Sequence, residues 1–511
     1  MPRATVIAVA TIIGVAGVAG VAGGTAIGLS VSGFSAIPGV FGGSRVSTIG
    51  AVDFTNPLSI PPLAASTIDE SGRRTFTLTA QTGSTEFIDG SRTPTWGFNG
   101  SYLGPTLVAE RGERVQINVR NELDEPTTVH WHGMHLPSAM DGGPHQKVES
   151  GAEWSPSWTI DQPASTLWYH PHPHGATEDH VARGLAGLFY VTDPLERGLD
   201  LPHEYGVDDI PVIVQDVRFD AAGALDRRGG FVGALGDRIL VNGTLAPILE
   251  VDRSVVRLRL LNASTARVFN FGFDDGRDIV LIGTDGGLLP RPQPLESLPL
   301  SPGERAEILV AVTPGETVVL QSRDPQLGAV VPFGGPDGGS DAFDVLQVNA
   351  AESLASEGVI PSDLVPIESL READASAERS FVLDGTEING RTMDLNRVND
   401  IVILNSTEIW TVTNDMPRPH NFHVHGVQFQ VLDQNGAAPP PTLSGWKDTI
   451  YLEPNVSYRL IMQFENFSDP NMPYMYHCHL LAHEDAGMMG QFVVVKPGES
   501  VGTPGGTVHQ H

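Results

Sequence analysis

Cysteine is nearly absent from this chain: Cys478 is the only one among 511 residues. A single thiol excludes an intrachain disulfide, so no such cross-link can stabilise the fold. A lone thiol would also be a liability in an exported protein unless something held it. Ligation of a metal ion would hold it, which makes the residues around Cys478 the first candidates for a functional site.

Positive charge is scarce as well. The chain has 31 lysines and arginines against 61 aspartates and glutamates, which gives a formal net charge of −30. This excess of acid argues against nucleic acid and against anionic lipid surfaces as partners. Solubility outside the cytoplasm or at high salt explains the excess most simply.

The N-terminal residues 4–32 carry no charge, and only Arg3 precedes them. This pattern predicts a secretory signal or an N-terminal anchor over residues 1–36, because the run is long enough to span a bilayer. We expect cleavage near residues 32–36 rather than a retained anchor. The protein would then be exported to an extracellular, cell-surface or periplasmic location, and membrane contact would involve only this segment. The residues 37–66 are rich in Gly, Ser and Pro and predict a linker.

Glycine and proline are abundant, with 57 and 39 residues, which is typical of short strands joined by turns. Alternating apolar residues such as Val115, Ile117 and Val119 predict half-buried strands. The chain length suits about three domains. We predict an all-β fold of three consecutive β-sandwich domains at residues 67–195, 196–370 and 378–497, followed by a flexible tail at 498–511.

Histidines occur in four His-x-His pairs. Residues two apart in a strand point to the same side, so each pair would present two imidazoles together. One such pair could equally lie on the surface, but four pairs favour metal ligation. The middle domain has only His203, at its border, and we predict that it is a scaffold while the metals bind where the first and third domains meet. The pairs are His130 with His132, His170 with His172, His423 with His425, and His477 with His479.

Cys478 lies between the histidines of the last pair and would face the opposite side of an extended strand. Together with His420, His483 and Met488 it offers the thiolate, two imidazoles and weak thioether of a blue-copper site. The eight paired imidazoles match a three-copper cluster in which one ion has two histidines and two ions have three each. These twelve side chains would therefore hold four copper ions with none left over.

The motifs resemble the four copper-binding motifs of the multicopper oxidases. They are His130-Trp131-His132-Gly133, His170-Pro171-His172, His420-Asn421-Phe422-His423-Val424-His425-Gly426, and His477-Cys478-His479 with His483 and Met488. The resemblance extends over residues 67–497. It is closest to the three-domain bacterial members, which include copper-efflux oxidases, laccases and bilirubin oxidases. It implies that each domain is a cupredoxin-like Greek-key β-sandwich.

The resemblance also implies a role for each side chain. The type 1 copper would bind His420, Cys478 and His483, with Met488 in the axial position. The type 2 copper would bind His130 and His423. One type 3 copper would bind His132, His170 and His479, and the other would bind His172, His425 and His477. Asp141 and Glu484 match the acids that deliver protons to oxygen in this family.

The implied activity is one-electron oxidation of a reducing substrate at the type 1 copper and four-electron reduction of O2 to water at the cluster. The donor would be a phenolic or other aromatic compound, or Cu(I). Two departures weigh against a dedicated Cu(I) oxidase. The third domain lacks a methionine-rich insertion, and only Asp415 and Met416 remain of the acid-and-methionine approach to His420.

Three alternatives remain open. A copper nitrite reductase has a simpler second site, and the intact set of eight paired histidines argues against it. A copper-free scaffold or division protein of the same fold would have lost ligands. A copper carrier or electron-transfer protein would need only Cys478 and its partners.

Overall fold

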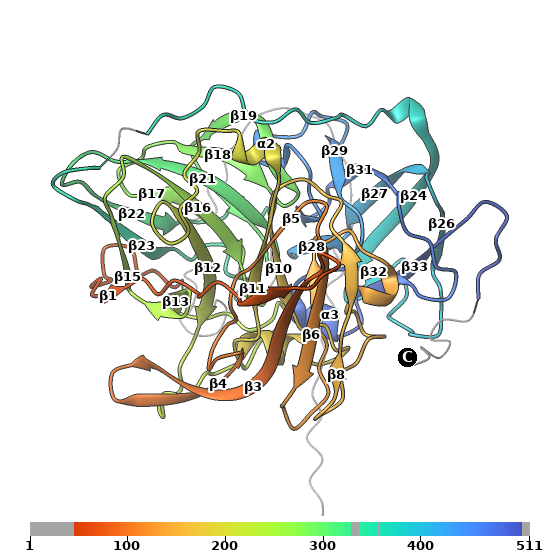
Figure 1. Cartoon of the computed structure of the whole chain (residues 1–511), viewed down its shortest axis with the longest axis horizontal. Helices are drawn as coiled ribbons and strands as arrows, with labels where there is room; N and C mark the ends of the chain where they lie inside the picture. The colour runs from red at the N-terminus through yellow and green to blue at the C-terminus, as the bar shows by residue number, and fades with distance from the viewer. Residues whose placement is uncertain (1–44, 329–336, 356–357, 503–511) are drawn as a thin grey trace, which may run out of the picture. The chain divides into compact units, whose positions relative to one another are not determined.

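The computed structural model describes residues 45–328, 337–355 and 358–502. The predicted signal or anchor at residues 1–36 lies outside the described residues, as do residues 503–511 of the predicted tail. Within the described ranges, no helix is long and apolar enough to cross a membrane. The strands of the described residues form six sheets, and the helices among these residues are few and short (Figure 1). The predicted all-β fold is therefore confirmed.

Two sheets formed largely by the first part of the described chain enclose a core that includes Phe76, Trp131 and Tyr169. The alternation predicted around Val115 is present, since Val115, Ile117 and Val119 are all buried. One sheet has the order β2-β3-β6-β8, with β4 paired to β3 and β9 to β6, and the other has the order β5-β11-β10-β7. The strands are β2 (Ser66–Ile68), β3 (Arg74–Ile88), β4 (Ser91–Phe98), β5 (Leu107–Glu110), β6 (Arg114–Asn121), β7 (His130–His132), β8 (Glu153–Trp154), β9 (Ser157–Thr159), β10 (Ser165–His170) and β11 (Gly187–Thr192).

The middle sheets have the orders β14-β13-β12-β16-β21-β18-β19 and β1-β15-β23-β22-β17-β20. Aliphatic and phenylalanine side chains from both sheets form the core. The strands are β1 (Asn56–Pro57), β12 (Asp209–Val217), β13 (Arg238–Val241), β14 (Thr244–Leu245), β15 (Pro247–Val251), β16 (Val255–Asn262), β17 (Phe269–Phe273), β18 (Ile279–Thr284), β19 (Gly287–Leu295), β20 (Leu298–Leu300), β21 (Arg305–Ala311), β22 (Thr317–Ser322) and β23 (Phe343–Ala350).

The last two sheets have the orders β25-β24-β27-β31-β29 and β26-β33-β32-β28-β30. Their core contains Cys478 and Met488 beside Trp410, Phe422 and Tyr476. The strands are β24 (Ala375–Asp384), β25 (Glu387–Ile388), β26 (Asp400–Ile403), β27 (Thr407–Asn414), β28 (His420–Val424), β29 (Phe429–Gln434), β30 (Thr449–Leu452), β31 (Ser457–Gln463), β32 (Tyr474–His477) and β33 (Met489–Val495).

Short helices and turns join these sheets. Helices α1 (Thr177–Ala182) and α3 (Leu481–Asp485) contact each other, and α3 follows directly after the His-Cys-His stretch. The Asp485 carboxylate accepts hydrogen bonds from the Thr177 and Glu178 amides at 2.8 and 2.9 Å and so holds α1 to α3. The remaining helical segments are α2 (Pro194–Arg197), η1 (Ser138–Met140), η2 (Glu372–Asp374) and η3 (Pro441–Leu443).

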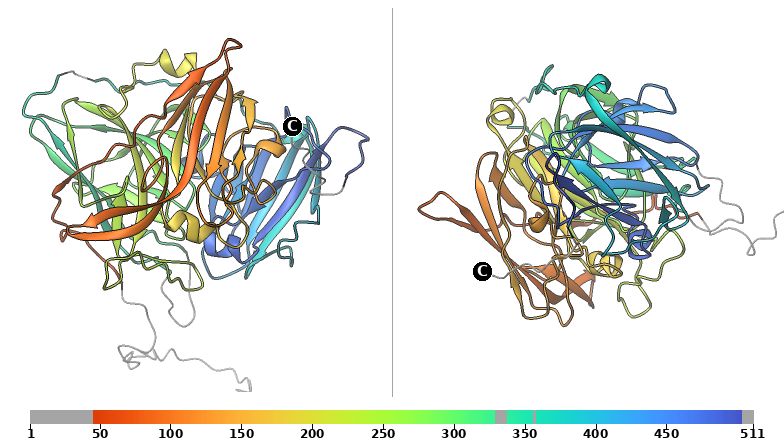
Figure 2. Two further views of the ribbon diagram at one scale, coloured as in Figure 1. Left: turned by 60° about the horizontal axis from the view of Figure 1, so that its bottom comes forward. Right: turned by 90° about the vertical axis from the view of Figure 1, so that its right-hand side faces the viewer.

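The three pairs of sheets adjoin one another (Figure 2). Strand β10 contacts β18, β19 and β21 of the middle sheets, while the Thr177 contact joins the first and last parts. The linker predicted at residues 37–66 includes β1, which adds to the edge of a middle sheet beside β15. The domain boundaries given above stay a prediction.

Candidate metal centres

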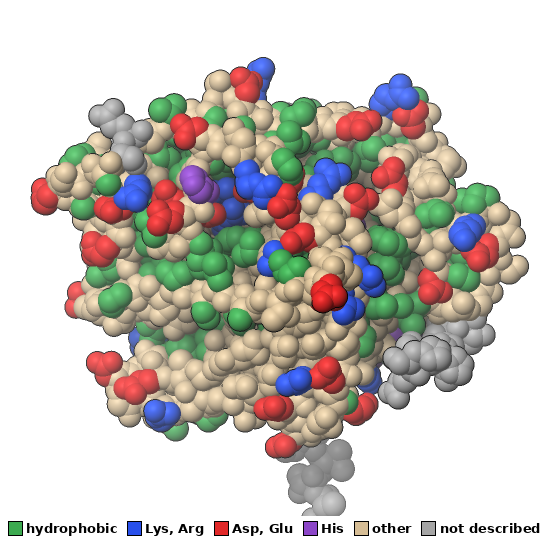
Figure 3. All heavy atoms as spheres, in the orientation of Figure 1, with side chains coloured by type: hydrophobic (Ala, Val, Ile, Leu, Met, Phe, Trp, Pro, Cys, Tyr) green, Lys and Arg blue, Asp and Glu red, His purple; other side chains and the backbone are tan. Residues whose placement is uncertain are grey.

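All twelve predicted ligand side chains are buried. Histidine side chains are accordingly rare on the molecular face drawn in Figure 3, although the chain has 17 of them. His174, two residues after the second pair, is exposed and is not one of the predicted ligands. Burial of so many imidazoles is costly unless their ring nitrogens are paired or ligated.

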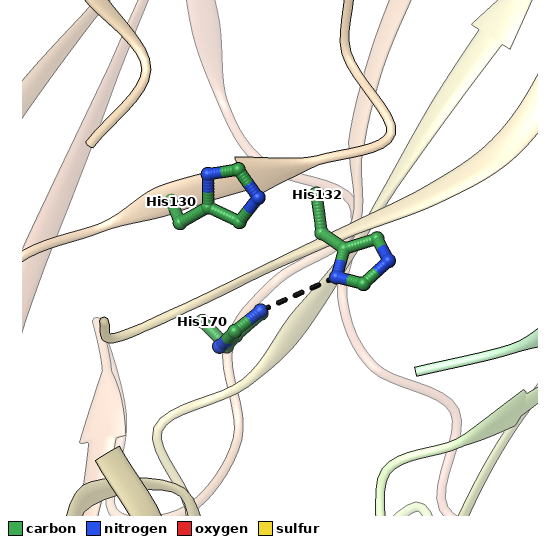
Figure 4. A group of neighbouring side chains, drawn as sticks. All are labelled: His130, His132 and His170. Atoms are coloured by element: carbon green, nitrogen blue, oxygen red, sulfur yellow. Dashed lines mark hydrogen bonds between the residues drawn. The ribbon is translucent and has the colours of Figure 1, made fainter. Parts of the chain in front are cut away.

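Three histidines of the first two pairs, His130, His132 and His170, lie on adjacent strands, and His172 follows the end of β10. Strands β7 and β10 are antiparallel, with His130 opposite His170 and His132 opposite Trp168. Because alternate residues share a face, His130, His132 and His170 point to one side of the sheet (Figure 4). The His132 Nδ1 and His170 Nε2 atoms are 3.4 Å apart.

In the other two pairs, His423 on β28 is opposite His477 on β32, whereas His425 and His479 follow the ends of these strands. The His172 and His425 Nε2 atoms each lie 3.1 Å from His477 Nε2. Three ring nitrogens thus converge, and this trio is the set predicted for one type 3 copper. The structure therefore brings together one histidine from each of three predicted pairs.

The predicted type 2 histidines share one arrangement. His130 donates its Nδ1–H to the Asp141 carbonyl at 2.9 Å, and His423 donates its Nδ1–H to the Asp448 carbonyl at 2.8 Å. Each ring therefore keeps the Nε2 lone pair free to bind a metal. Neither Nε2 atom has a hydrogen-bond partner, although both are buried. The two rings lie 5.8 Å apart between centroids.

The trio predicted for the other type 3 copper is less tightly grouped. His132 and His170 approach each other as described, and together with His130 they form a group of potential ligand atoms. His479 lies 5.0 Å from His132 and 5.2 Å from His170 between ring centroids. Both its ring nitrogens are buried without a hydrogen-bond partner. Unpaired buried nitrogens of this kind are typical of positions at which an ion binds.

The predicted type 1 ligands form a separate triangle. Cys478 Sγ lies 3.6 Å from His420 Nδ1 and 3.7 Å from His483 Nδ1, and the two nitrogens are 3.1 Å apart. A point equidistant from the three atoms lies about 2.0 Å from each, which is the length of a bond from a divalent transition metal to imidazole nitrogen. Met488 is buried in the same hydrophobic cluster as Cys478. The triangle therefore fits a single metal ion.

Asp141 and Glu484 are buried, and each contacts two of the predicted ligands. Asp141 Oδ2 accepts a hydrogen bond from His425 Nδ1 at 2.7 Å, and Oδ1 lies 3.4 Å from His130 Nδ1. Glu484 lies 3.3 Å from His172 Nδ1 and 3.1 Å from His477 Nδ1. Both acids therefore lie behind the imidazoles, where they can orient the rings and hold protons close to the cluster.

Sequence reasoning missed a third acid. The Asp448 carboxylate accepts a hydrogen bond from His132 Nε2 at 3.0 Å and lies 3.6 Å from His423 Nδ1. Asp448 is fully buried and forms two hydrogen bonds with Arg305, at 2.7 and 2.6 Å. A lysine and an aspartate directly before the apolar strand β30 were the only signal in the sequence.

Asn421 was also missed. Its Oδ1 accepts a hydrogen bond from the His479 amide at 2.6 Å, and its Nδ2 donates to Ser301 Oγ and the Pro302 carbonyl at 3.1 and 2.9 Å. It therefore joins the His-Cys-His stretch to a loop of the middle sheets. The Asn within His420-Asn421-Phe422-His423 lies between ligands in the sequence, which is a weak signal by itself.

Burial shifts the protonation equilibria toward forms that bind metal. It lowers the pKa of His172 and His477 to about 3 and that of His423 and His483 to about 4. These imidazoles are therefore neutral at pH 7, as ligation requires. Burial raises the pKa of the Cys478 thiol to about 12. A bound cation would be needed to hold Cys478 as a thiolate, because a coordinated thiol loses its proton.

Models of a known protein family match the sequence over both parts that supply the predicted ligands. Models described as multicopper oxidase match residues 79–196 and 366–498. "Multicopper oxidase mco" from Staphylococcus haemolyticus is 35% identical over 448 residues, which cover 86% of this chain and 92% of the relative. The chain belongs to the multicopper oxidase family, whose members bind copper and use O2 with a reducing substrate.

A solved structure supports the fold. The laccase-like multicopper oxidase CueO from Ochrobactrum sp. is similar with a TM-score of 0.77 and 37% identity, covering 86% of this chain and all of that one. The prediction of cupredoxin-like β-sandwiches is confirmed by this likeness. "Cell division protein FtsP" from Dickeya dadantii is 37% identical over 447 residues, covering 86% of this chain and 92% of that protein. The family therefore includes relatives with another named role.

Proposed function

We propose that this chain is a multicopper oxidase with four copper ions, which couples oxidation of an organic electron donor to reduction of O2 to water. The observation that carries the proposal is that all twelve predicted ligands are buried and that ten of them fall into two separate groups of potential ligand atoms. When bound, the copper ions would take electrons from the donor one at a time and pass four of them to O2. The residues of the chain hold the ions, separate the two sites and supply protons.

A scaffold or division protein of the same fold is the second candidate, favoured by the similarity to FtsP. A carrier or electron-transfer protein without oxidase turnover is the third. A scaffold has no need of buried imidazoles whose ring nitrogens lack partners, as in His130, His423 and His479. A carrier needs only the Cys478 group. The unpaired nitrogens therefore favour the oxidase over both.

The two groups of ligands are joined through Cys478. His477 and His479 flank it in the sequence and point toward the cluster, while its Sγ faces His420 and His483. An electron accepted at Cys478 would cross only a few covalent bonds to reach either histidine. This supports the assignment of the stretch as the electron path.

The donor would approach at His483. His483 Nε2 donates a hydrogen bond to the Phe231 carbonyl at 2.9 Å, and Phe231 is 46% exposed. The Arg418 guanidinium lies 4.1 Å above the Phe231 ring. An aromatic ring with an arginine beside it suits a planar, electron-rich or anionic donor and disfavours Cu(I). We therefore favour a phenolic donor over a cuprous ion.

Protons for water formation would pass through Asp141 and Glu484. Each lies against the outer nitrogens of two cluster histidines, and both acids are nearly inaccessible to solvent. We also propose that the protein is exported, on the basis of the uncharged residues 4–32.

Oxygen uptake by the copper-loaded protein tests the proposal. A phenolic donor should give steady O2 consumption that Cys478→Ser abolishes, and Cu(I) should give less. Absence of O2 uptake with either donor in a protein that contains four copper ions would refute the oxidase.

A further inference from the structure

The middle sheets reach the histidine cluster through one buried arginine. Arg305, the first residue of β21, is fully buried, and each of its five side-chain N–H groups has an acceptor. Nε donates to the Thr166 carbonyl at 3.0 Å. Nη1 donates to the Gly303 carbonyl and Asp448 Oδ1 at 3.0 and 2.7 Å, and Nη2 donates to the Asp285 carbonyl and Asp448 Oδ2 at 3.0 and 2.6 Å. This arginine therefore joins all three pairs of sheets.

The Asp448 carboxylate is held rigidly by this two-pronged contact. Arg305 occupies one side of the carboxylate, and Thr449 Oγ1 donates to Oδ1 at 2.9 Å. The third side chain at Oδ1 is His132, whose Nε2 lies 3.0 Å away. A carboxylate only accepts hydrogen bonds, so His132 must carry its proton on Nε2 and leave Nδ1 as the free electron pair.

Five of the other seven cluster histidines show the opposite arrangement. His130, His170, His423, His425 and His477 each donate Nδ1–H to a carbonyl or carboxylate oxygen, which leaves Nε2 free. His132 instead directs Nδ1 toward His170 Nε2. His132 is therefore the cluster histidine whose Nε2, rather than Nδ1, is hydrogen-bonded to a carboxylate, that of Asp448.

We propose that Arg305 and Asp448 are positioning residues that fix the Nε2–H form of His132, so that this histidine binds copper through Nδ1. The middle sheets, which supply no ligand, thereby control the geometry of the oxygen-reducing cluster. This inference rests on the copper cluster of the proposed function.

Two glycines support the proposal independently. A Cβ at Gly133, which has a φ of +86°, would lie 2.6 Å from both Arg305 Nη2 and Asp448 Oδ2. The glycine of the His130-Trp131-His132-Gly133 motif thus leaves room for the ion pair. A Cβ at Gly303 would lie 3.1 Å from ring atoms of His132 and His479. The backbone of the middle sheets therefore packs directly against the cluster histidines.

Further buried charges hold Arg305 and Asp448 in place. Asp285 Oδ1 accepts a hydrogen bond from the Arg305 amide at 2.8 Å, and Lys447 Nζ lies 3.0 Å from Asp285 and 2.9 Å from Glu304. All five side chains are at most 4% exposed. They comprise two cations and three carboxylates, and the extra carboxylate suits a position next to metal cations.

The Asp448→Asn variant tests the proposal. An asparagine has one acceptor oxygen and so cannot accept from both Nη1 and Nη2 of Arg305, which breaks the two-pronged contact and leaves the side chain that orients His132 no longer fixed. We expect the blue absorption of the Cys478 site to remain. The near-ultraviolet absorption of the cluster should be lost, and copper affinity at the cluster should fall about 10- to 100-fold.

A matched control separates positioning from general destabilisation. Arg267 Nη1 donates to Asp341 Oδ2 at 2.8 Å in a similarly buried pair that contacts no predicted ligand. Asp341→Asn should lower the melting temperature without changing either absorption band or the copper content. If Asp448→Asn leaves the near-ultraviolet absorption and the copper content as in the unmodified protein, the proposal is overturned while the proposed function stands.

A measurement on the unmodified protein covers the case in which the variant does not fold. In a crystal structure of the copper-loaded chain, His132 should bind copper through Nδ1 with Nε2 hydrogen-bonded to Asp448. Ligation through Nε2 would overturn the proposal. A loaded protein without any copper at the histidine cluster would overturn the proposed function and this inference together.

Discussion

Single residues decide how strongly each candidate site holds its metal. At the proposed type 1 site, the Met488 amide donates to the His483 carbonyl at 2.9 Å, and the Met488 carbonyl accepts from the Cys478 amide at 3.1 Å. Met488 is thus tied by backbone to two ligands and buried beside them. The thioether would be the weak fourth ligand, which tunes the reduction potential.

Replacement of Met488 by leucine removes the thioether and nearly preserves side-chain volume. We expect Met488→Leu to keep the blue absorption and to raise the reduction potential, which a redox titration of that absorption would measure. Met462→Leu is the matched control, because Met462 is buried in the same hydrophobic cluster. An unchanged potential in Met488→Leu would remove Met488 from the axial position.

Arg418 is predicted to select the donor. It lies over the exposed Phe231 ring that covers His483, so a reversed charge there should repel anionic donors. We expect Arg418→Glu to raise the KM for a phenol that carries a carboxylate about tenfold, on the order of 1.4 kcal/mol of lost attraction, and to change the KM for a neutral phenol little. Oxygen-uptake kinetics measure both values. Arg371→Glu, at an exposed arginine paired with Asp374, is the control, and equal effects on both donors would contradict this assignment.

At the scale of elements, strand alternation separates the two proposed metal sites. On β28, His420 and Phe422 face the core that contains Cys478, whereas Asn421 and His423 face the other side. In the His-Cys-His stretch, Cys478 likewise faces one side, and His477 and His479 face the other. Two adjoining segments therefore each present one residue to the type 1 site and others to the cluster, and their shared register fixes the distance between the sites.

The Asn421 side chain holds these two segments together. In Asn421→Leu the His479 amide loses its buried acceptor, which should lower the free energy of unfolding of the copper-free protein by about 1–3 kcal/mol. Urea denaturation would measure this loss. Asn270→Leu is a control, since Asn270 bonds an exposed part of the middle sheets. A loss no larger than that of the control would contradict the role given to Asn421.

Much of this site could be predicted from the sequence, because paired histidines follow the two-residue period of a strand. The presence of the Cys478 group followed from the chemistry of its side chains. Asp448 and Arg305 could not be found in this way, since they are 143 residues apart and each looks like an ordinary charged residue at the start of a strand. Their contact depends on how separate sheets pack, which local patterns do not encode. The same applies to Phe231 and His483, which are 252 residues apart.

At the scale of the whole molecule, the cluster joins segments from both ends of the described chain. His172 from the first part and His425 from the last part both contact His477 of the last part. Arg305 of the middle sheets binds Asp448, which lies beside the cluster. Folding therefore buries ionisable side chains that only assembled sheets can enclose. Stability and metal binding should both depend on the protonation of these side chains.

The copper-free protein should lose stability at mildly acidic pH. The pKa of His423 and His483 is about 4 in the folded state, below the 6.5 of an exposed histidine. The unfolded chain therefore binds more protons, and stability that is fully present above pH 6.5 is lost as the pH falls toward 4. Urea denaturation at a series of pH values measures this slope. A free energy of unfolding that stays constant down to pH 4 would contradict the burial of neutral histidines.

The central claim is that this chain holds one type 1 copper at Cys478 and three coppers among eight histidines. The most direct measurement is the absorption spectrum of the copper-loaded protein together with its copper content. We predict four copper ions per chain, an intense blue absorption and a near-ultraviolet shoulder. Blue absorption alone with one copper per chain, or no bound copper, would contradict the claim and favour the carrier or the scaffold, respectively.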